Sequence, residues 1–293
     1  MEIQLQIAQA LLAFTFILTP LVHAGSPVDQ APRASVKLLT VGNSFADNST
    51  HFLPELSKAG GKELILFRAN LGGHSFQQHV EYIEAFEASP ADPKGSPYQV
   101  KVDPVTQEQT DGVSLRAALQ SAPWDVVTIQ QVSHLSPQYE TYQPHAKTLV
   151  DYIRKYAPQA QILIQETWAY PEDCPRYSDP KLLYLQNPEV MYQNVKAAYT
   201  QLSVDTGLGL IPVGDAFQAV LSGPHPIRLH NKADIHANAN GEFLGAAMFY
   251  EAIFRDSVLS NPYVPKGVTP EDAKRLREVA HKTVAKTAKA AIK

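Results

Sequence analysis

The sequence predicts an α/β fold in which a mostly parallel sheet lies between two layers of helices. Five short apolar segments alternate along the chain with segments of helical periodicity. Their apolar residues run continuously, which is typical of strands that are buried on both faces of a parallel sheet. Such strands are joined by right-handed crossovers. We therefore expect a three-layer α/β/α architecture around five strands.

The individual elements follow from the apolar runs and from the residues that end them. The expected strands are residues 35–42, 62–69, 124–131, 160–167 and 208–214. The expected helices are residues 49–60, 75–88, 114–122, 144–157, 189–207, 241–256 and 271–292. Two segments are expected to lack regular structure, namely residues 89–112, rich in Pro, Asp, Gln and Gly, and the aromatic and Pro-rich loop 168–188.

The composition is that of an ordinary globular protein. The 293 residues are 44% hydrophobic and 18% charged, with a formal net charge of -4. No basic excess argues for a nucleic-acid partner or for an anionic membrane surface. No linker separates two cores, so residues 30–293 are expected to form a single domain.

The first 24 residues have the features of a secretory signal peptide. The apolar run "ALLAFTFILTPLVHAG" ends in small residues that suit cleavage after Ala24. It is short for a membrane span and is interrupted by Pro20. We expect a secreted or periplasmic protein without stable membrane insertion after cleavage. The preceding "MEIQLQ" has no Lys or Arg, so an uncleaved anchor remains the alternative.

Polar or glycine-rich residues lie at the carboxyl ends of four of the five expected strands. In open α/β sheets, ligands bind outside the carboxyl ends of the strands, so these positions are where chemistry is expected. They are Gly42–Ser44, Asn70–Gly73, Gln130–Gln131 and Glu166–Trp168.

Ser44 by itself is compatible with a nucleophile, a phosphate contact or a helix cap. A serine nucleophile needs a base within hydrogen-bond reach, and the base needs an orienting group. His236 lies in the small, polar segment "NKADIHANANGEF", two residues after Asp234. In an extended loop, residues two apart point the same way, so Asp234 can meet one imidazole nitrogen and leave the other for Ser44.

Three sequence blocks together resemble the SGNH/GDSL hydrolase superfamily. They are "LLTVGNSFAD", "NLGGHSF" and "ADIHANANGEFLGAA", and they occur in the order of that family. "GNSF" and "WDVVTIQQVS" are especially similar to a largely secreted bacterial branch. The resemblance implies a flavodoxin-like sheet and a serine esterase. It implies Ser44 as nucleophile, His236 as general base and Asp234 as triad acid, with no cofactor and no metal.

The resemblance also implies an oxyanion hole, with one departure from the family pattern. The backbone N–H groups of Ser44 and of Gly72 or Gly73 match two of its donors. The family's third block supplies an Asn side chain, whereas the third strand here ends in two glutamines. A Gln amide offers the same N–H donor, so we expect Gln131, and Gln130 next, in this role. Because successive side chains along a strand point to opposite faces, only one of the two glutamines is expected to donate to the oxyanion.

The substrate is expected to be a small-molecule or carbohydrate ester with a short acyl group, such as acetyl. Asn43, Trp168 and Tyr170 are candidate substrate contacts. Asn43 could instead hold its own loop in place, and the two aromatic side chains could instead pack their loop against the domain. Two alternatives remain open, a lipase or thioesterase acting on other acyl chains and an inactive carbohydrate-binding member of the fold. Four histidines, in the pairs His74–His79 and His225–His230, are interpreted as ordinary packing or surface residues. Cys174 is interpreted as a loop thiol without a catalytic role.

Overall fold

A computed structural model describes residues 31–101 and 109–290. The predicted signal peptide at residues 1–24 lies outside these residues. The described chain contains one seven-stranded sheet with the strand order β4-β3-β2-β1-β5-β6-β7. The strands are β1 (Ser35–Gly42), β2 (Glu63–Asn70), β3 (Tyr98–Lys101), β4 (Gln109–Val113), β5 (Val126–Ile129), β6 (Gln161–Gln165) and β7 (Gly209–Ile211).

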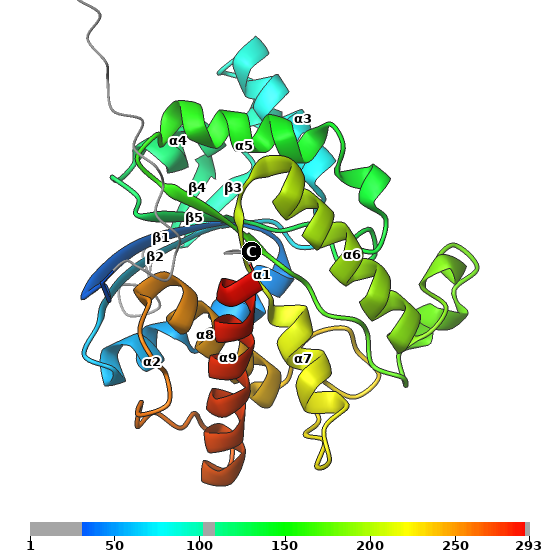
Figure 1. Cartoon of the computed structure of the whole chain (residues 1–293). Helices are drawn as coiled ribbons and strands as arrows, with labels where there is room; N and C mark the ends of the chain where they lie inside the picture. The colour runs from blue at the N-terminus through cyan, green and yellow to red at the C-terminus, as the bar shows by residue number, and fades with distance from the viewer. Residues whose placement is uncertain (1–30, 102–108, 291–293) are drawn as a thin grey trace, which may run out of the picture.

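Helices cover both faces of the sheet (Figure 1). One layer contains α3 (Phe76–Ala88), α4 (Leu115–Gln120), α5 (His145–Tyr156) and α6 (Pro188–Thr206). The other contains α1 (Ser44–Thr50), α2 (Leu53–Ala59), α7 (Val213–Leu221), α8 (Ala239–Phe254) and α9 (Pro270–Ala290). No helix in the described ranges is both long enough and apolar enough to cross a bilayer.

The predicted fold class is confirmed. The five predicted strands are present and parallel, in the order β2-β1-β5-β6-β7. This is the flavodoxin-like order, in which the chain first extends the sheet on one side of β1 and then on the other. The switch point therefore lies between β1 and β5. Ligands bind at such a point in open α/β sheets, and Ser44 follows β1 directly.

Residues 89–112 contain more structure than predicted. A 3₁₀ turn at Pro93–Gly95 leads into β3, which is antiparallel to β2 and to β4. These two strands extend the sheet beyond the five parallel ones. They are short and lie at one edge of the sheet, so they carry almost none of the continuous apolar pattern that marks the other strands.

The expected strand at residues 208–214 is shorter than predicted, because β7 ends at Ile211 and helix α7 begins at Val213. Helix α7 was not predicted. A Cβ added at Gly214 would lie 2.2 Å from the carbonyl oxygen of Thr167, so the first turn of α7 needs a glycine to approach the end of β6. In the sequence, a glycine after an apolar run looks like the end of a strand.

A buried carboxyl group holds α7 against the end of β6. Glu166 is 1% exposed, and its Oε2 accepts a hydrogen bond from the backbone N–H of Asp215 at 2.9 Å. The Asp215 carboxylate pairs with the Lys196 ammonium of α6 at 2.9 Å. Burial, together with the nearby charge of Asp215, raises the pKa of Glu166 to about 8. Glu166 is therefore protonated in the folded protein at neutral pH.

Replacing this carboxyl group should make stability less dependent on pH. The folded protein keeps the Glu166 proton up to about pH 8, whereas the ordinary pKa is 4.5. The folded state binds more protons between these values, so the free energy of unfolding falls as the pH rises through this window, by on the order of a few kcal/mol. Urea unfolding at pH 5, 7 and 9 should give a flatter profile for Glu166→Gln. The exposed Glu84→Gln variant serves as the control, and equal slopes in all three proteins would contradict the assignment.

Candidate active site

The turn from β1 into α1 is fixed by the side chain of Asn43. Its Oδ1 accepts a hydrogen bond from the backbone N–H of Phe45 at 3.2 Å, which caps α1. Its Nδ2 donates to the carbonyl oxygen of His74 at 3.1 Å, which ties the turn to the loop after β2. Asn43 therefore has the loop-holding contacts that were one of its two expected roles.

Gln130 holds the same turn from the end of β5. Its Oε1 accepts from the backbone N–H of Asn43 at 3.2 Å, and its Nε2 donates to Oδ1 of Asn43 at 3.1 Å. The amide comes so close that a Cβ at Gly42 would lie 2.7 Å from its Oε1. A larger residue at the end of β1 would therefore have to displace the Gln130 amide that holds the backbone next to Ser44.

A buried histidine completes the support of this turn. Nε2 of His79 donates to the carbonyl oxygen of Gly42 at 3.1 Å, and Nδ1 accepts from the Tyr98 hydroxyl at 2.7 Å. Burial lowers the pKa of His79 to about 4, although the hydrogen bond to Gly42 opposes the shift. The imidazole is therefore neutral at ordinary pH.

Ser44, His236 and Asp234 lie together as the sequence predicted. Oγ of Ser44 is 3.0 Å from Nε2 of His236. Nδ1 of His236 is 3.1 Å from Oδ1 of Asp234 and 3.3 Å from Oδ2. The imidazole ring packs against Phe45 in a T-shaped contact, with the ring centroids 5.9 Å apart. A hydroxyl, an imidazole and a carboxylate in this order form the arrangement in which the imidazole can take the hydroxyl proton.

The Asp234 carboxylate is charged at neutral pH. Partial burial acts to raise its pKa, but hydrogen bonds from His236 and from the backbone N–H of Ile235 outweigh burial and lower the pKa below the ordinary 3.8. The contact with the Ile235 N–H is 2.6 Å long and fixes the carboxylate orientation. Ala233, just before it, has φ 53°, an uncommon value for a residue other than glycine. The loop therefore has a specific conformation that delivers Asp234 to the imidazole.

Ser44 and His236 line a pocket of about 490 Å³, here called the Ser44 pocket. Its described lining residues are Asn43, Ser44, Gly72, Gly73, Val132, Ser133, His134, Arg176, Ile235 and His236. Within the described chain, no hydrogen bond uses the backbone N–H of Ser44, Gly72 or Gly73. Gly73 has φ 72°, a left-handed conformation that favours glycine. These three N–H groups are available to a ligand in the pocket.

The structure does not support the predicted oxyanion role of either glutamine. Oε1 of Gln131 accepts from the N–H groups of Phe76 and Val132, both at 2.9 Å, and its Nε2 donates to Thr141. The Gln130 amide is used on Asn43 and on the Gln131 carbonyl oxygen. Neither residue lines the Ser44 pocket. Both amides are consumed in holding backbone segments, so they have no free donor for a ligand.

The prediction that Trp168 and Tyr170 stack on a sugar ring is wrong. Trp168 is 1% exposed, and its two faces are covered by Phe45 at 4.1 Å and Phe217 at 4.5 Å between ring centroids. Its Nε1–H donates to the carbonyl oxygen of Ile235 at 3.0 Å. Tyr170 is also 1% exposed. Both rings pack the loop down, which was the other expected role, and Trp168 also supports the segment that carries His236.

The comparison with protein families gives a match over residues 37–283, to a domain of unknown function named DUF4886. The chain belongs to the DUF4886 family. A crystal structure of a DUF4886 family protein from Bacteroides uniformis ATCC 8492 is 27% identical, with a TM-score of 0.76 over 86% of this chain and 95% of that chain.

A protein from Slackia heliotrinireducens, described as a candidate SGNH hydrolase, is also similar in structure. It is 23% identical, with a TM-score of 0.51 over 74% of this chain and 98% of that chain. This likeness shows that the DUF4886 domain has the SGNH hydrolase fold, as the resemblance implied. No curated protein matches the sequence.

Of the four histidines interpreted as packing or surface residues, His74, His79 and His230 have hydrogen-bond partners in this DUF4886 domain, and His225 is exposed. Nδ1 of His74 meets the Gly72 carbonyl oxygen at 2.8 Å, and its Nε2 meets the Tyr82 hydroxyl at 2.9 Å. Nε2 of His230 meets the Ala169 carbonyl oxygen at 3.1 Å. Among the residues described, no three His, Cys, Asp or Glu side chains are grouped to hold a metal ion.

Sequence reasoning missed Asn48, which couples the two halves of the site. Oδ1 of Asn48 accepts from the N–H of Ala237 at 3.3 Å, and Nδ2 donates to Glu242 at 3.1 Å. Asn48 thereby joins α1 to the segment after His236 and to α8. Its position four residues after Ser44, on the same face of a helix, was the signal that could have indicated it.

The pocket-lining residues Ser133, His134 and Arg176 were also missed. Ser133 and His134 follow two buried glutamines, and Arg176 lies in the Pro-rich loop, so none belongs to a recognisable motif. The hydroxyl of Ser133 meets that of Tyr170 at 2.8 Å. Only the three-dimensional packing of the loop 168–188 against the end of β5 reveals that these residues lie near Ser44.

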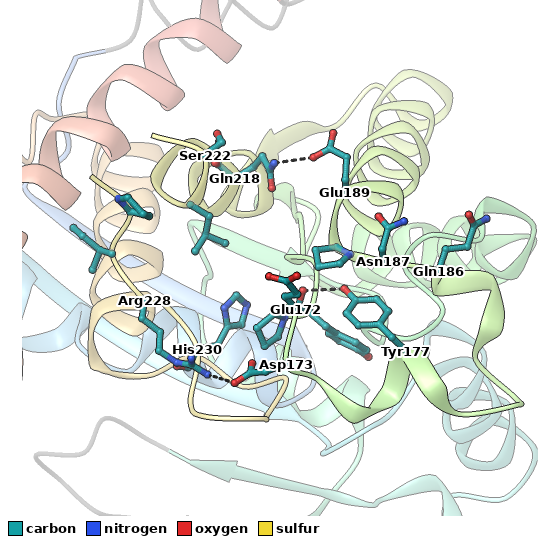
Figure 2. A pocket seen from close by; sticks show the side chains of 16 residues that line it. Glu172, Asp173, Tyr177, Gln186, Asn187, Glu189, Gln218, Ser222, Arg228 and His230 are labelled. Atoms are coloured by element: carbon teal, nitrogen blue, oxygen red, sulfur yellow. Dashed lines mark hydrogen bonds and ion pairs between the residues drawn. The ribbon is translucent and has the colours of Figure 1, made fainter. Parts of the chain in front are cut away.

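A larger cavity of about 950 Å³, drawn in Figure 2, has none of Ser44, Asp234 and His236 among its described lining residues. It is bordered by the loop 168–188, the start of α6, the end of α7 and residues 226–230, and shares no lining residue with the Ser44 pocket. Several of its polar side chains are paired with one another, as in Asp173 with Arg228 and Glu189 with Gln218. Ser222 and His230 both line it, but the Ser222 hydroxyl donates to the Gln218 carbonyl oxygen and Nε2 of His230 meets the Ala169 carbonyl oxygen. No serine–histidine hydrogen bond is therefore found among its described lining residues, and the smaller Ser44 pocket is the candidate active site.

Removing the indole of Trp168 should destabilise the protein rather than weaken substrate binding. Trp168→Ala is expected to lower the free energy of unfolding by about 3–5 kcal/mol, because it empties the space between two stacked phenylalanines. Trp168→Phe keeps a ring between the phenylalanines but loses the hydrogen bond to Ile235 and part of the indole volume, so its cost should be smaller, about 1–3 kcal/mol. Urea unfolding measures both. A higher KM with unchanged stability in Trp168→Ala would restore the sugar-stacking role.

Proposed function

We propose that this DUF4886 protein is a serine esterase that hydrolyses short acyl esters, such as acetyl esters on carbohydrate. The observation that carries the proposal is the unbroken series Asp234–His236–Ser44 in a pocket with three unpaired backbone N–H groups. If Ser44 served only to cap helix α1, it would not need an oriented imidazole nitrogen 3.0 Å from its Oγ. A phosphate contact would not need the carboxylate behind that imidazole.

The proposed reaction is acyl transfer to water. His236 takes the proton of Ser44 through Nε2, and Oγ attacks the ester carbonyl carbon to form a tetrahedral intermediate. The intermediate collapses as the same imidazole protonates the leaving alcohol, which leaves an acyl-enzyme. His236 then activates a water molecule that releases the acid. Asp234 stays ionised and holds the imidazole in the tautomer that this sequence of steps requires.

The negative oxygen of the intermediate is proposed to lie against backbone rather than amide side chains. The N–H of Ser44 and the N–H of Gly72 or Gly73 are the donors, since all three line the pocket without another partner. Gln130 contributes indirectly, because it fixes the backbone from which the Ser44 N–H projects.

The size and lining of the pocket favour a short acyl group. Its volume is about 490 Å³, and among the described lining residues only Val132 and Ile235 have apolar side chains. Two apolar side chains cannot solvate a long acyl chain, so this lining supports an acetyl-sized group more than a lipid. The amide, hydroxyl, imidazole and guanidinium groups of the other lining residues can form hydrogen bonds with an alcohol rich in hydroxyl groups. With the predicted signal peptide, the proposed enzyme acts outside the cytoplasm on small-molecule or carbohydrate esters.

Loss of the nucleophile or base should abolish turnover. Ser44→Ala and His236→Ala are each expected to lower kcat on 4-nitrophenyl acetate by roughly 10⁴–10⁶, because the residues act as a unit. A fluorophosphonate probe should label the wild-type protein and not Ser44→Ala. The matched control is Ser89→Ala, at an exposed serine after α3, which should be labelled and active. Full activity in Ser44→Ala would falsify the proposal.

Replacing the orienting carboxylate should lower kcat while leaving the fold intact. Asn in Asp234→Asn can present an N–H to Nδ1 and so stabilise the wrong imidazole tautomer, with an expected loss of about 10²–10⁴ in kcat. The exposed Asp151→Asn variant on α5 carries the same change of charge and should retain activity. Steady-state kinetics together with circular dichroism measures the effect. Equal kcat for the two variants would remove Asp234 from the mechanism.

A further inference from the structure

The Ser44 pocket contains a cation without an acidic partner. Arg176 lines the pocket, and no Asp or Glu in the described chain forms an ion pair with it. Elsewhere, Arg116 pairs with Glu87, and Arg228 pairs with Asp173. An arginine that is half-buried beside a reaction centre and lacks such a partner is positioned to meet a charge on the ligand.

The local structure holds Arg176 in place. It lies in a 3₁₀ turn, Pro175–Ser178, between the buried Cys174 and the half-buried Tyr177. The Tyr177 hydroxyl donates to the Tyr170 carbonyl oxygen at 2.8 Å, which anchors the turn. The guanidinium group lies over the Tyr170 ring, 5.7 Å from its centroid. This stacking limits the motion of the side chain and orients its donors before any ligand arrives.

The described lining of the pocket has one positively charged side chain and no acidic one. None of the described lining residues is Asp or Glu, and the nearby Asp234 carboxylate is engaged by His236. His134 also lines the pocket. Burial, and to a lesser extent the positive charge of Arg176, lowers the pKa of its imidazole. It is therefore neutral at ordinary pH and adds no second positive charge. The pocket has one cation, which matches one negative charge on a ligand.

We propose that Arg176 binds a carboxylate of the substrate, so that the preferred substrates are short acyl esters of acidic sugars. The planar guanidinium offers two parallel N–H donors that fit a carboxylate, and a single positive charge suits a monoanion. Ser44 and Arg176 line one pocket, so an acyl group at Ser44 and a carboxylate at Arg176 belong to one small molecule. This inference rests on the proposed esterase function and names the class of its alcohol.

Two matched substrates test the inference. Acetylated glucuronic acid carries a carboxylate, and acetylated glucuronamide has the same shape without the charge. The wild-type enzyme should prefer the acid in kcat/KM, and added salt should reduce the preference because it screens the half-exposed arginine. In Arg176→Gln, the ratio of kcat/KM for acid over amide should fall by roughly 10- to 100-fold, the range of a charge-assisted hydrogen bond.

Control variants separate charge from geometry. Arg154→Gln removes an exposed arginine of α5, which pairs with Asp151, and should retain the wild-type ratio. Arg176→Lys keeps the positive charge but loses the two parallel N–H donors of the guanidinium group, so the ratio of kcat/KM for acid over amide should be intermediate. Circular dichroism and thermal melting check that each variant is folded.

The outcomes distinguish the two proposals. A wild-type enzyme that hydrolyses 4-nitrophenyl acetate but treats acid and amide alike overturns the inference about Arg176 alone. The inference also fails if Arg176→Gln slows both substrates equally, because the arginine would then have a structural role. A wild-type protein with no esterase activity and no labelling of Ser44 by the fluorophosphonate probe would instead overturn the proposed function.

Discussion

The candidate site depends first on the pair of hydrogen bonds between Gln130 and Asn43. These bonds join the ends of two adjacent parallel strands, β5 and β1, at the point where the strand order reverses. A strand end at such an edge would otherwise leave backbone groups without partners and a turn free to move. With the Gln130 amide on one side and His79 on the Gly42 carbonyl oxygen, the Ser44 backbone has a single position. A hydroxyl can be matched to an imidazole only when both are fixed in this way.

The second requirement is to bring together residues that are 192 positions apart, Ser44 and His236. The sheet cannot supply this contact, because the segment with His236 follows β7 and α7 rather than a strand next to β1. Two packing links replace it. Trp168 lies between Phe45 and Phe217 and donates to Ile235, and Asn48 accepts from the segment after His236. The triad geometry is therefore a property of the α1 side of the domain as much as of the sheet.

Sequence reasoning succeeded where the signal was local. The five parallel strands, Ser44 after β1, and Asp234 two residues before His236 all follow from short patterns that determine their own geometry. It failed for Gln130, Gln131 and Trp168, because their chemistry suits two roles equally well. An amide can serve a ligand or a backbone, and an indole can stack on a sugar or on phenylalanine. Only the neighbours decide, and those neighbours are tens of residues away in the sequence. The same limit hid α7, whose first turn needs Gly214 for a contact with the end of β6.

The loop 168–188 contains two kinds of residue, those that pack beneath the segment with His236 and Arg176, which we propose binds a substrate carboxylate. Its buried residues, Trp168 and Tyr170, pack beneath the segment that carries Asp234 and His236. This packing requires large aromatic side chains at both positions. Arg176 contributes nothing to that packing except its contact with the Tyr170 ring. A change at Arg176 therefore alters the charge of the pocket without disturbing Ser44, His236 or the backbone donors. Under the proposed function, Arg176 is a position that can change with the alcohol of the ester while Ser44 and His236 stay in place.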